Sequence, residues 1–265
     1  MKPSGVITIT TDFGHKGPFA GVMKGVILSR FPGASIVDLA HDIPAHWPPE
    51  AGFWISRSYT YFPQGTVHVA IVDPGVGTDR EIIIFEHDGH TFMAPDNGLL
   101  APLLNLSDGD DLYHLDPDKL AHLGLAPPSL TFHGRDIFAP IAAEIAAGKL
   151  SVADIGKPTT DWTPGWLDDP EVIAGKIHGV IVTIDAFGNL ISNIDAALLE
   201  PMQTPTVSLA GHSFQLSATY GHVQPGEYLA LINSFGVLEI ARAEGSAAEG
   251  LGGDRGAPVL VTDKG

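Results

Sequence analysis

The sequence predicts an α/β protein with a second, all-β domain, and three observations support that prediction. In the N-terminal part, β-branched strand patterns alternate with helical ones, the order that builds a mostly parallel central sheet flanked by helices. Residues 155–171 hold three prolines and two glycines and show no periodicity. From residue 172 the pattern contains only short strands, typical of a small barrel or sandwich. We therefore predict an α/β domain at 1–154, a linker at 155–171 and an all-β domain at 172–265.

The first elements follow one another in the order of a parallel sheet. Residues 6–10 predict an apolar strand that ends at Asp12, and 18–31 predict a helix with apolar residues at i, i+3 and i+4. Residues 36–39 predict a second strand, and 50–62 predict a second helix. Each strand is thus followed by a helix that can return the chain to the same edge of the sheet.

The stretch 66–80, TVHVAIVDPGVGTDR, is the centre of the predicted sheet. It begins as an alternating β-branched strand and then breaks, because Pro74 has no N–H to donate and Gly77 tolerates a positive φ. The break places Asp73 at the end of a strand and Arg80 seven residues later. Ligands of open α/β sheets bind at the carboxyl ends of strands, so this pair is either a site or a structural ion pair.

The remaining elements are shorter. Residues 81–86 and 90–94 predict a hairpin around an Asp-Gly turn, 99–104 a short helix, and 137–147 an Ala-rich helix. The strands expected in the C-terminal domain lie at 175–185, 189–194, 205–210, 212–217, 227–234 and 236–241.

Composition excludes several classes of function. The net charge of −17 disfavours a nucleic-acid partner, because phosphate backbones are repelled. The absence of cysteine removes disulfides, thiolate metal sites and a cysteine nucleophile. No signal-peptide pattern and no apolar run of about 18 residues is present, so we expect a cytoplasmic protein with no membrane partner.

Two groups of polar residues are candidate sites, each with an ordinary structural alternative. Asp12 and Asp73 both follow strands, and two such carboxylates could accept hydrogen bonds from a ribose or similar diol, or merely cap the next turn. Asp73, Arg80 and His133 could together hold and polarise a water molecule. The alternative is a buried ion pair and an unrelated core histidine.

The other candidates are histidines and exposed aromatic residues. The twelve histidines show no tight metal-binding cluster, so we expect them to be scattered over the surface and predict no metal site. Trp47 lies in a stiff, proline-rich loop and could stack on a ligand or cover the core. Phe187 and Phe235 lie in similar turns, at 185–189 and 233–236, which are either ordinary turns or places where an interface or a planar ligand covers an exposed Phe.

Seven motifs, in order along nearly the whole chain, resemble the S-adenosylmethionine hydroxide adenosyltransferase family. These enzymes are adenosyl-forming S-adenosylmethionine hydrolases related to the fluorinase and chlorinase. The motifs are TDFG at 11–14, the HDIP loop before Trp47, VDPGVGTDR at 72–80, APDNGLL at 94–100, FHGRDIFAP at 132–140, IDAFGNLISNI at 184–194 and INSFGVLEIA at 232–241.

The resemblance implies both a fold and an activity. The fold would be an N-terminal α/β domain with a C-terminal β-barrel, in a homotrimer that binds its ligand between one subunit's N-terminal domain and a neighbour's C-terminal domain. The activity would be hydrolysis of S-adenosyl-L-methionine to adenosine and L-methionine by attack of water or hydroxide at C5′. S-adenosylmethionine would be the substrate, and no cofactor or metal would be needed.

The resemblance also implies residue roles. The water-holding trio falls on Asp73, Arg80 and His133, the ribose-binding carboxylate on Asp12, and the aromatic contact on Trp47. The methionine and adenine contacts fall on Asp185, Phe187 and Asn189, with Ser234 and Phe235 nearby.

Two departures from the halogenase pattern bear on the alternatives. Ile191 stands where the halogenases have a Trp, and Phe235 where they have an Arg, so a chloride-using enzyme is the second interpretation. A non-catalytic S-adenosylmethionine or adenosine sensor is the third. A metallohydrolase is a distant fourth.

Overall fold

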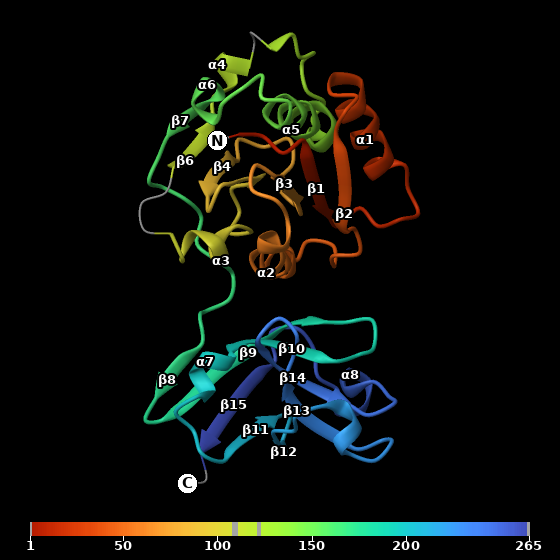
Figure 1. Ribbon diagram of the computed structural model, residues 1–265, viewed down its shortest axis with the longest axis vertical. Helices are drawn as coiled ribbons and strands as arrows, with labels where there is room; N and C mark the ends of the chain where they lie inside the picture. The colour runs from red at the N-terminus through yellow and green to blue at the C-terminus, as the bar shows by residue number, and fades with distance from the viewer. Residues whose placement is uncertain (1, 108–110, 121–122, 264–265) are drawn as a thin grey trace. The chain divides into compact units, whose positions relative to one another are not determined.

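The computed structural model describes residues 2–107, 111–120 and 123–263, which form two compact units at 1–166 and 167–265 (Figure 1). The unit boundary therefore falls inside the segment 155–171 that the sequence analysis assigned to a linker. Part of that segment is regular structure, because Gly156–Pro158 forms an edge strand, β7, of the first unit's sheet. The units are described separately below.

The first unit is built on a seven-stranded sheet with the order β2-β1-β3-β5-β4-β6-β7. Its strands are β1 (Val6–Thr11), β2 (Ser35–Ala40), β3 (Val67–Ile71), β4 (Ile82–His87), β5 (His90–Pro95), β6 (Asp111–Leu115) and β7 (Gly156–Pro158). Its helices are α1 (Phe19–Arg30), α2 (Pro48–Ser58), α3 (Ala101–Leu104), α4 (Pro117–Leu120), α5 (Ala139–Ala146) and α6 (Val152–Ile155), with a 3-10 turn at Tyr59–Tyr61 and a π-helical turn at Gly134–Phe138.

The sheet is mixed rather than mostly parallel. Strands β2, β1, β3 and β5 are parallel, as predicted, whereas β5, β4, β6 and β7 pair antiparallel. The predicted hairpin supplies β4 and β5. Strands β6 and β7 were not predicted, because each is short and lies in a polar or proline-containing stretch without clear alternation.

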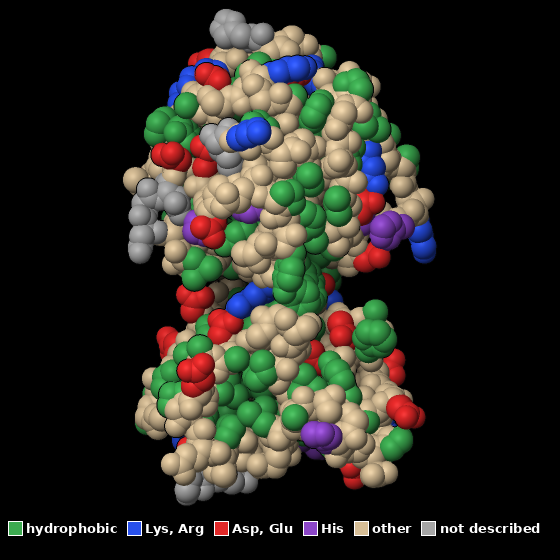
Figure 2. All heavy atoms as spheres, in the orientation of Figure 1, with side chains coloured by type: hydrophobic (Ala, Val, Ile, Leu, Met, Phe, Trp, Pro, Cys, Tyr) green, Lys and Arg blue, Asp and Glu red, His purple; other side chains and the backbone are tan. Residues whose placement is uncertain are grey.

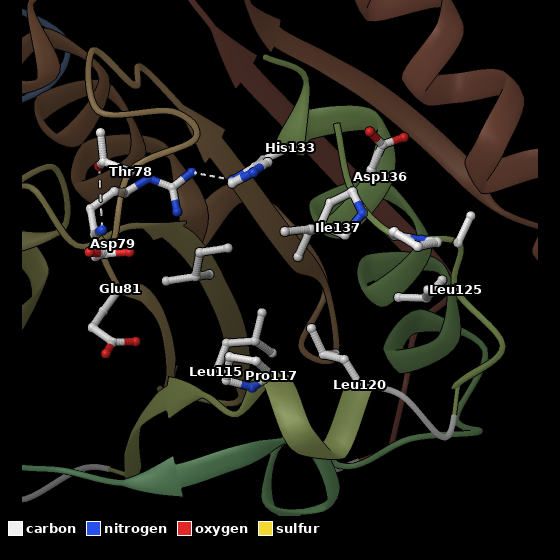
Figure 3. Close-up of a pocket in the computed structure, with 15 residues that line it drawn as sticks. Thr78, Asp79, Glu81, Leu115, Pro117, Leu120, Leu125, His133, Asp136 and Ile137 are labelled. Atoms are coloured by element: carbon white, nitrogen blue, oxygen red, sulfur yellow. Dashed lines mark hydrogen bonds between the residues drawn. The ribbon is translucent and has the colours of Figure 1, made fainter. Parts of the chain in front are cut away.

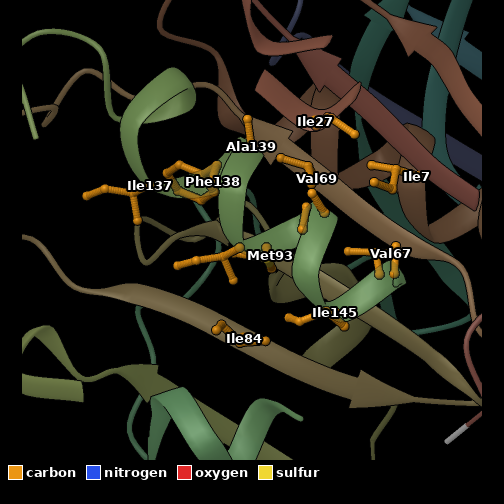
Figure 4. Close-up of a cluster of buried hydrophobic side chains, with 14 of the residues drawn as sticks. Ile7, Ile27, Val67, Val69, Ile84, Met93, Ile137, Phe138, Ala139 and Ile145 are labelled. Carbon is orange, nitrogen blue, oxygen red and sulfur yellow. The ribbon is translucent and has the colours of Figure 1, made fainter. Parts of the chain in front are cut away.

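Helices cover both faces of this sheet (Figure 1). On one face, α1 and α5 pack over side chains that point the same way from successive strands, including Ile7, Val67 and Val69 (Figure 4). The alanines of α5 let its backbone approach α1 and the sheet closely, which large side chains would prevent. On the other face, α2 and α3 cover Ala70 and Phe92.

The second unit is an eight-stranded, largely antiparallel sheet with the order β12-β11-β15-β9-β10-β14-β13, and β8 pairs with β9 off this path. Its elements are β8 (Glu171–Ile173), β9 (Lys176–Ile184), β10 (Leu190–Asp195), α7 (Ala196–Leu199), β11 (Pro205–Leu209), β12 (His212–Gln215), a 3-10 turn at Tyr220–His222, β13 (Tyr228–Ile232), β14 (Val237–Arg242), α8 (Ala247–Leu251) and β15 (Pro258–Asp263).

The second sheet curls until its two ends nearly meet. A bridge between Leu216, just after β12, and Ala230 of β13 joins the ends, so the sheet is a nearly closed barrel around one apolar core. The sequence analysis predicted the strands from β9 to β14. It did not predict β15, a short apolar run near the chain end that lies between β11 and β9 in the sheet.

Acidic side chains are scattered over the visible face of both units, in keeping with the net charge of −17 (Figure 2). Among the described residues, no helix is long and apolar enough to cross a membrane.

Several histidines are buried, which corrects the expectation that they lie on the surface. His41, His68, His90 and His133 are all buried. In the sheet, Thr8 Oγ1 lies 2.8 Å from His68 Nδ1, and His68 Nε2 lies 3.2 Å from His90 Nδ1. Burial, together with the neighbouring His90, lowers the pKa of His68 to about 3. His68 and His90 therefore belong to the core rather than to a solvated face.

The buried His68 predicts a loss of stability in acid. Its pKa is lower in the folded than in the unfolded protein, so the unfolded state binds the proton first and folding weakens as the pH falls below about 6.5. Between pH 7.5 and 5.0 this group should remove about 2 kcal/mol from the free energy of unfolding. Urea unfolding at both pH values measures the loss. His68→Gln should reduce the difference, whereas the exposed-site variant His178→Gln should leave it unchanged.

Candidate active site

Two parallel strands bring the first two predicted carboxylates to one edge of the sheet. β1 and β3 are neighbours, with Thr11 opposite Ile71 at their carboxyl ends. Asp12 follows β1 directly, and Asp73 follows β3 after one buried valine. Burial, and to a smaller extent the charge of Asp73, raises the pKa of Asp12. The matching positions that the sequence suggested are thus on the same edge.

Asp73, Arg80 and His133 are in direct contact. Arg80 Nε donates to Asp73 Oδ1 at 2.9 Å and to Oδ2 at 3.0 Å, and Arg80 Nη2 also donates to Oδ2. Arg80 Nη2 lies 3.0 Å from His133 Nδ1. The Arg80 and Asp73 side chains are only 11% and 5% exposed. The ordinary alternative of an unrelated core histidine therefore does not describe His133, although 53 residues separate it from Arg80.

The loop between Asp73 and Arg80 is held in one shape by its glycine and by a neighbouring segment. Gly77 has a φ of +79°, and a Cβ there would lie 2.1 Å from the backbone oxygen of Leu130. Only glycine fits so close an approach. Thr78 Oγ1 donates to the Gly75 oxygen at 2.7 Å within the same loop. This packing against residue 130 brings the loop beside the segment that carries His133.

His133 is held as a neutral imidazole with a defined tautomer. It precedes the π-helical turn Gly134–Phe138 and is buried. Burial and the charge of Arg80 both lower the pKa of His133. Because a guanidinium has only donors, His133 Nδ1 must accept from Arg80, and the imidazole proton lies on Nε2. His133 can therefore donate a hydrogen bond from Nε2.

Asp12 is half-buried and held by the loop that follows β2. The backbone N–H of His46 donates to Asp12 Oδ2 at 3.3 Å. Burial is the largest effect on this carboxyl and, despite that hydrogen bond, raises the pKa of Asp12. A carboxylate so placed still has lone pairs for a diol, but it becomes protonated at a higher pH than an ordinary aspartate.

Trp47 follows His46, whose backbone N–H contacts Asp12. The ring of Trp47 packs edge to face against the ring of Trp166, with centroids 6.2 Å apart, and the sequence analysis did not select Trp166. Trp166 Nε1 donates to the Asn97 oxygen at 2.8 Å, and Asn97 Nδ2 donates to the Val72 oxygen at 2.8 Å. The APDNGLL motif therefore connects Trp166 to the residue before Asp73. Trp166 lay in the expected linker, and only its aromatic type could have drawn attention to it.

The predicted residues of the second unit lie in two turns. In the turn between β9 and β10, Asp185 Oδ1 accepts from the backbone N–H groups of Phe187 and Asn189, both at 2.9 Å, and Asn189 Nδ2 donates to Oδ2. This shape leaves the Phe187 side chain 79% exposed. Asp185 thus caps its own turn whatever else it binds.

The turn between β13 and β14 repeats this arrangement. Asn233 Oδ1 accepts from the backbone N–H groups of Phe235 and Val237 at 3.0 and 3.3 Å. Ser234 is exposed. Phe235 is half-buried, so its side chain is less exposed than the sequence analysis expected. These contacts all lie inside the second unit and are independent of the trio.

A cavity of about 650 Å³ adjoins the trio in the first unit (Figure 3). His133, Asp136 and Ile137 lie along one wall, and Leu115, Pro117 and Leu120 along another. Arg80 also lines it, whereas Asp12 and Trp47 do not. The Arg80–His133 contact therefore borders a largely apolar hollow of a size that accepts a small molecule.

Fold and site together define a class of protein. A sheet edge carries two carboxylates, and a buried, hydrogen-bonded Asp–Arg–His trio follows one of its strands, while a barrel forms a separate unit. The N-terminal domain of the SAM hydroxide adenosyltransferase family matches residues 7–156, and its C-terminal domain matches residues 179–260. The chain belongs to this S-adenosylmethionine hydroxide adenosyltransferase family.

Individual relatives agree with that assignment over nearly full length. The chain is 36% identical to the (R)-S-adenosyl-L-methionine hydrolase of Thermus thermophilus, covering 98% of this chain and 100% of the relative. It is 34% identical to that of Salinispora tropica, covering 99% of each. A fluorinase from an Actinoplanes species is 28% identical over 97% of each chain. The crystal structure of a conserved protein from Thermotoga maritima superposes with a TM-score of 0.87 at 31% identity, covering 97% of this chain and 99% of that one.

Proposed function

We propose that this protein hydrolyses S-adenosyl-L-methionine to adenosine and L-methionine. The observation that carries the proposal is the Asp73–Arg80–His133 trio at the sheet edge of a chain in this family. A protein that only binds its ligand has no use for three polar groups that could together hold and polarise a water molecule. The names of the relatives specify the R epimer at sulfur, and we propose the same epimer as the substrate here.

The proposed reaction is an in-line displacement at C5′. The sulfonium makes C5′ electrophilic, and methionine leaves as a neutral thioether. Water attacks opposite sulfur at a distance of about 3–3.5 Å, its O–C5′ bond forming as the C5′–S bond breaks. The pair of electrons from that bond stays on sulfur, and the water releases one proton.

The three residues would divide the work on that water. Arg80 supplies fixed positive charge and His133 a neutral Nε2–H donor, and both favour hydroxide character on the attacking oxygen. Asp73 has only acceptor atoms when ionised, so it orients a water O–H and is the natural first acceptor of its proton. His133 Nδ1 already accepts from Arg80, which makes it less suited to that task.

The remaining candidates would bind the substrate. Asp12 would accept hydrogen bonds from the ribose hydroxyls, and Trp47 would cover the substrate beside it. Asp185, Phe187 and Asn189, with Ser234 and Phe235, would contact the methionine and adenine ends from a neighbouring subunit. We propose a homotrimer for this reason, since the exposed Phe187 would then have a surface to cover it.

Product analysis in 18O-labelled water tests the reaction. The expected result is adenosine with 18O at its 5′ oxygen, together with L-methionine, from the R epimer and without any need for chloride. A 5′-chloro product formed on addition of chloride would move the protein to the halogenases. Bound but unconverted substrate of both epimers would indicate a sensor, and activity lost with EDTA would indicate a metallohydrolase.

Mixing two inactive variants tests the shared site. Asp73→Asn and Asp185→Ala would each remove one side of every site in a homotrimer. If the sites form between subunits, refolding the two variants together should restore about a quarter of wild-type activity, because a quarter of random pairings join two intact sides. No recovery, or a monomer by light scattering, would show that the sites are not shared.

A further inference from the structure

A chain of hydrogen bonds runs from Asp38 on β2 through His41 to Thr11, the last residue of β1, next to Asp12. Asp38 Oδ1 on β2 lies 2.9 Å from His41 Nε2, and His41 Nδ1 lies 2.8 Å from Thr11 Oγ1. Lys24 Nζ donates to the other oxygen of Asp38 at 2.5 Å. The order Asp–His–Thr resembles the connectivity of a nucleophilic triad. Nothing in the proposed hydrolysis uses it.

The direction of every bond in this chain can be assigned. Burial acts to raise the pKa of Asp38, but hydrogen bonds from Lys24 and His41 outweigh it and lower that pKa, so Asp38 is ionised. An ionised carboxylate only accepts, so His41 donates from Nε2, and Nδ1 of the neutral imidazole is then an acceptor. Beside the neutral imidazole, the Thr11 hydroxyl donates to His41 Nδ1. Its lone pair accepts the backbone N–H of Phe13 at 3.2 Å.

A nucleophilic role for Thr11 is excluded by its surroundings. Its side chain is 0% exposed, and the hydroxyl already makes two hydrogen bonds within the fold. These two hydrogen bonds fix the turn on both sides of Asp12. Thr11 is held through its side chain, and Phe13 is held through its backbone N–H. A third bond joins Gly14 N–H to the His41 oxygen at 2.8 Å. Both flanks of Asp12 are thus fixed to His41.

We propose that Asp38, His41 and Thr11 are positioning residues that hold Asp12 in the orientation needed to bind the substrate. The proposal rests on the function proposed above. The hydrogen bond from His46 N–H to the Asp12 carboxylate is long, at 3.3 Å, so it restrains the side chain only weakly. The orientation of its carboxylate depends on the backbone of the turn, and the turn depends on the Thr11 hydroxyl.

Substitution of Thr11 tests this role. Thr11→Val keeps the shape and removes the hydroxyl, and we expect KM for S-adenosylmethionine and Kd for adenosine to rise about 5- to 10-fold while kcat changes less than about twofold. Thr11→Ser keeps the hydroxyl, so its KM and Kd should remain close to the wild-type values. Thr10→Val is the matched control: Thr10 is the adjacent residue of the same strand, and its buried hydroxyl has no hydrogen-bond partner within the described residues. Its KM and Kd should equal those of the wild type.

A double-mutant cycle shows whether Thr11 acts through Asp12. Asp12→Ala alone should raise KM more than Thr11→Val does, and adding Thr11→Val to it should raise KM no further. Effects that multiply would overturn the proposal, as would a Thr11→Val variant that lowers kcat with KM and Kd unchanged. A wild-type protein that binds adenosine but forms no adenosine from S-adenosylmethionine would instead contradict the proposed function, and the Kd series would still test the positioning role.

Discussion

Asp73→Asn is expected to lower kcat for S-adenosylmethionine hydrolysis by about 10²- to 10⁴-fold, with Kd for the substrate changed less than about threefold. Asparagine keeps the shape of the side chain but replaces one acceptor oxygen with a donor NH₂, which faces the donors of Arg80. The water then loses its anionic partner. Adenosine release at saturating substrate gives kcat, and calorimetry on the inactive variant gives Kd.

Asparagine is a sharper test here than alanine. Asp73 and Arg80 form a nearly buried pair. Alanine would remove both oxygens that accept from Arg80 and leave its donors unsatisfied, whereas asparagine keeps the side-chain volume and one acceptor oxygen. Asp79→Asn is the control, since Asp79 is an exposed carboxylate of the same loop outside the trio, and its kcat should match the wild type. Full activity in Asp73→Asn would remove Asp73 from the mechanism. An equal loss in Asp79→Asn would assign the effect to the loop.

The parts of this site that could be predicted are those with local signals. The strand before Asp73 alternates regularly, and the Pro-Gly-x-Gly break that follows it forces a shaped loop, so the position of Asp73 at a strand end follows from a few residues. The parallel order of β1 and β3 then places Asp12 on the same edge. The spacing of residues in the sequence did not predict the contact between His133 and Arg80. The family resemblance supplied that expectation, and the geometry places the two side chains in contact.

Other features depend on contacts that no local pattern records. Trp166 reaches Trp47 only because Thr163 and Trp166 hydrogen-bond to the turn at Asp96 and Asn97, nearly seventy residues earlier in the chain. His41 looks like any loop histidine until β2 places it below Thr11. Strand β7 lies at the edge of the sheet and β6 lies between β7 and β4, and this pairing stabilises two short, weakly patterned segments. In each case long-range pairing outweighs local propensity.

Arg80→Lys is expected to lower kcat by about 10²- to 10³-fold even though it keeps the positive charge. Arg80 donates through Nε and Nη2 to Asp73 and through Nη2 to His133, which requires a planar fork of donors. A lysine ammonium is a point charge on a flexible stem and cannot reproduce that fork. The water would lose the fixed geometry of both neighbours at once. Steady-state rates of adenosine release measure the loss.

Arg135→Lys provides the matched control, because Arg135 is also paired with an aspartate, Asp136, but is 41% exposed and outside the trio. Its kcat should change less than about threefold. The 15N spectrum of His133 gives a second measurement that is independent of turnover. If Arg80 donates to Nδ1, the wild type shows the proton on Nε2, and Arg80→Lys weakens that preference. A wild-type His133 protonated on Nδ1 would contradict the assigned bond. The water would then face a different His133 nitrogen, and Arg80 would act on it through charge alone.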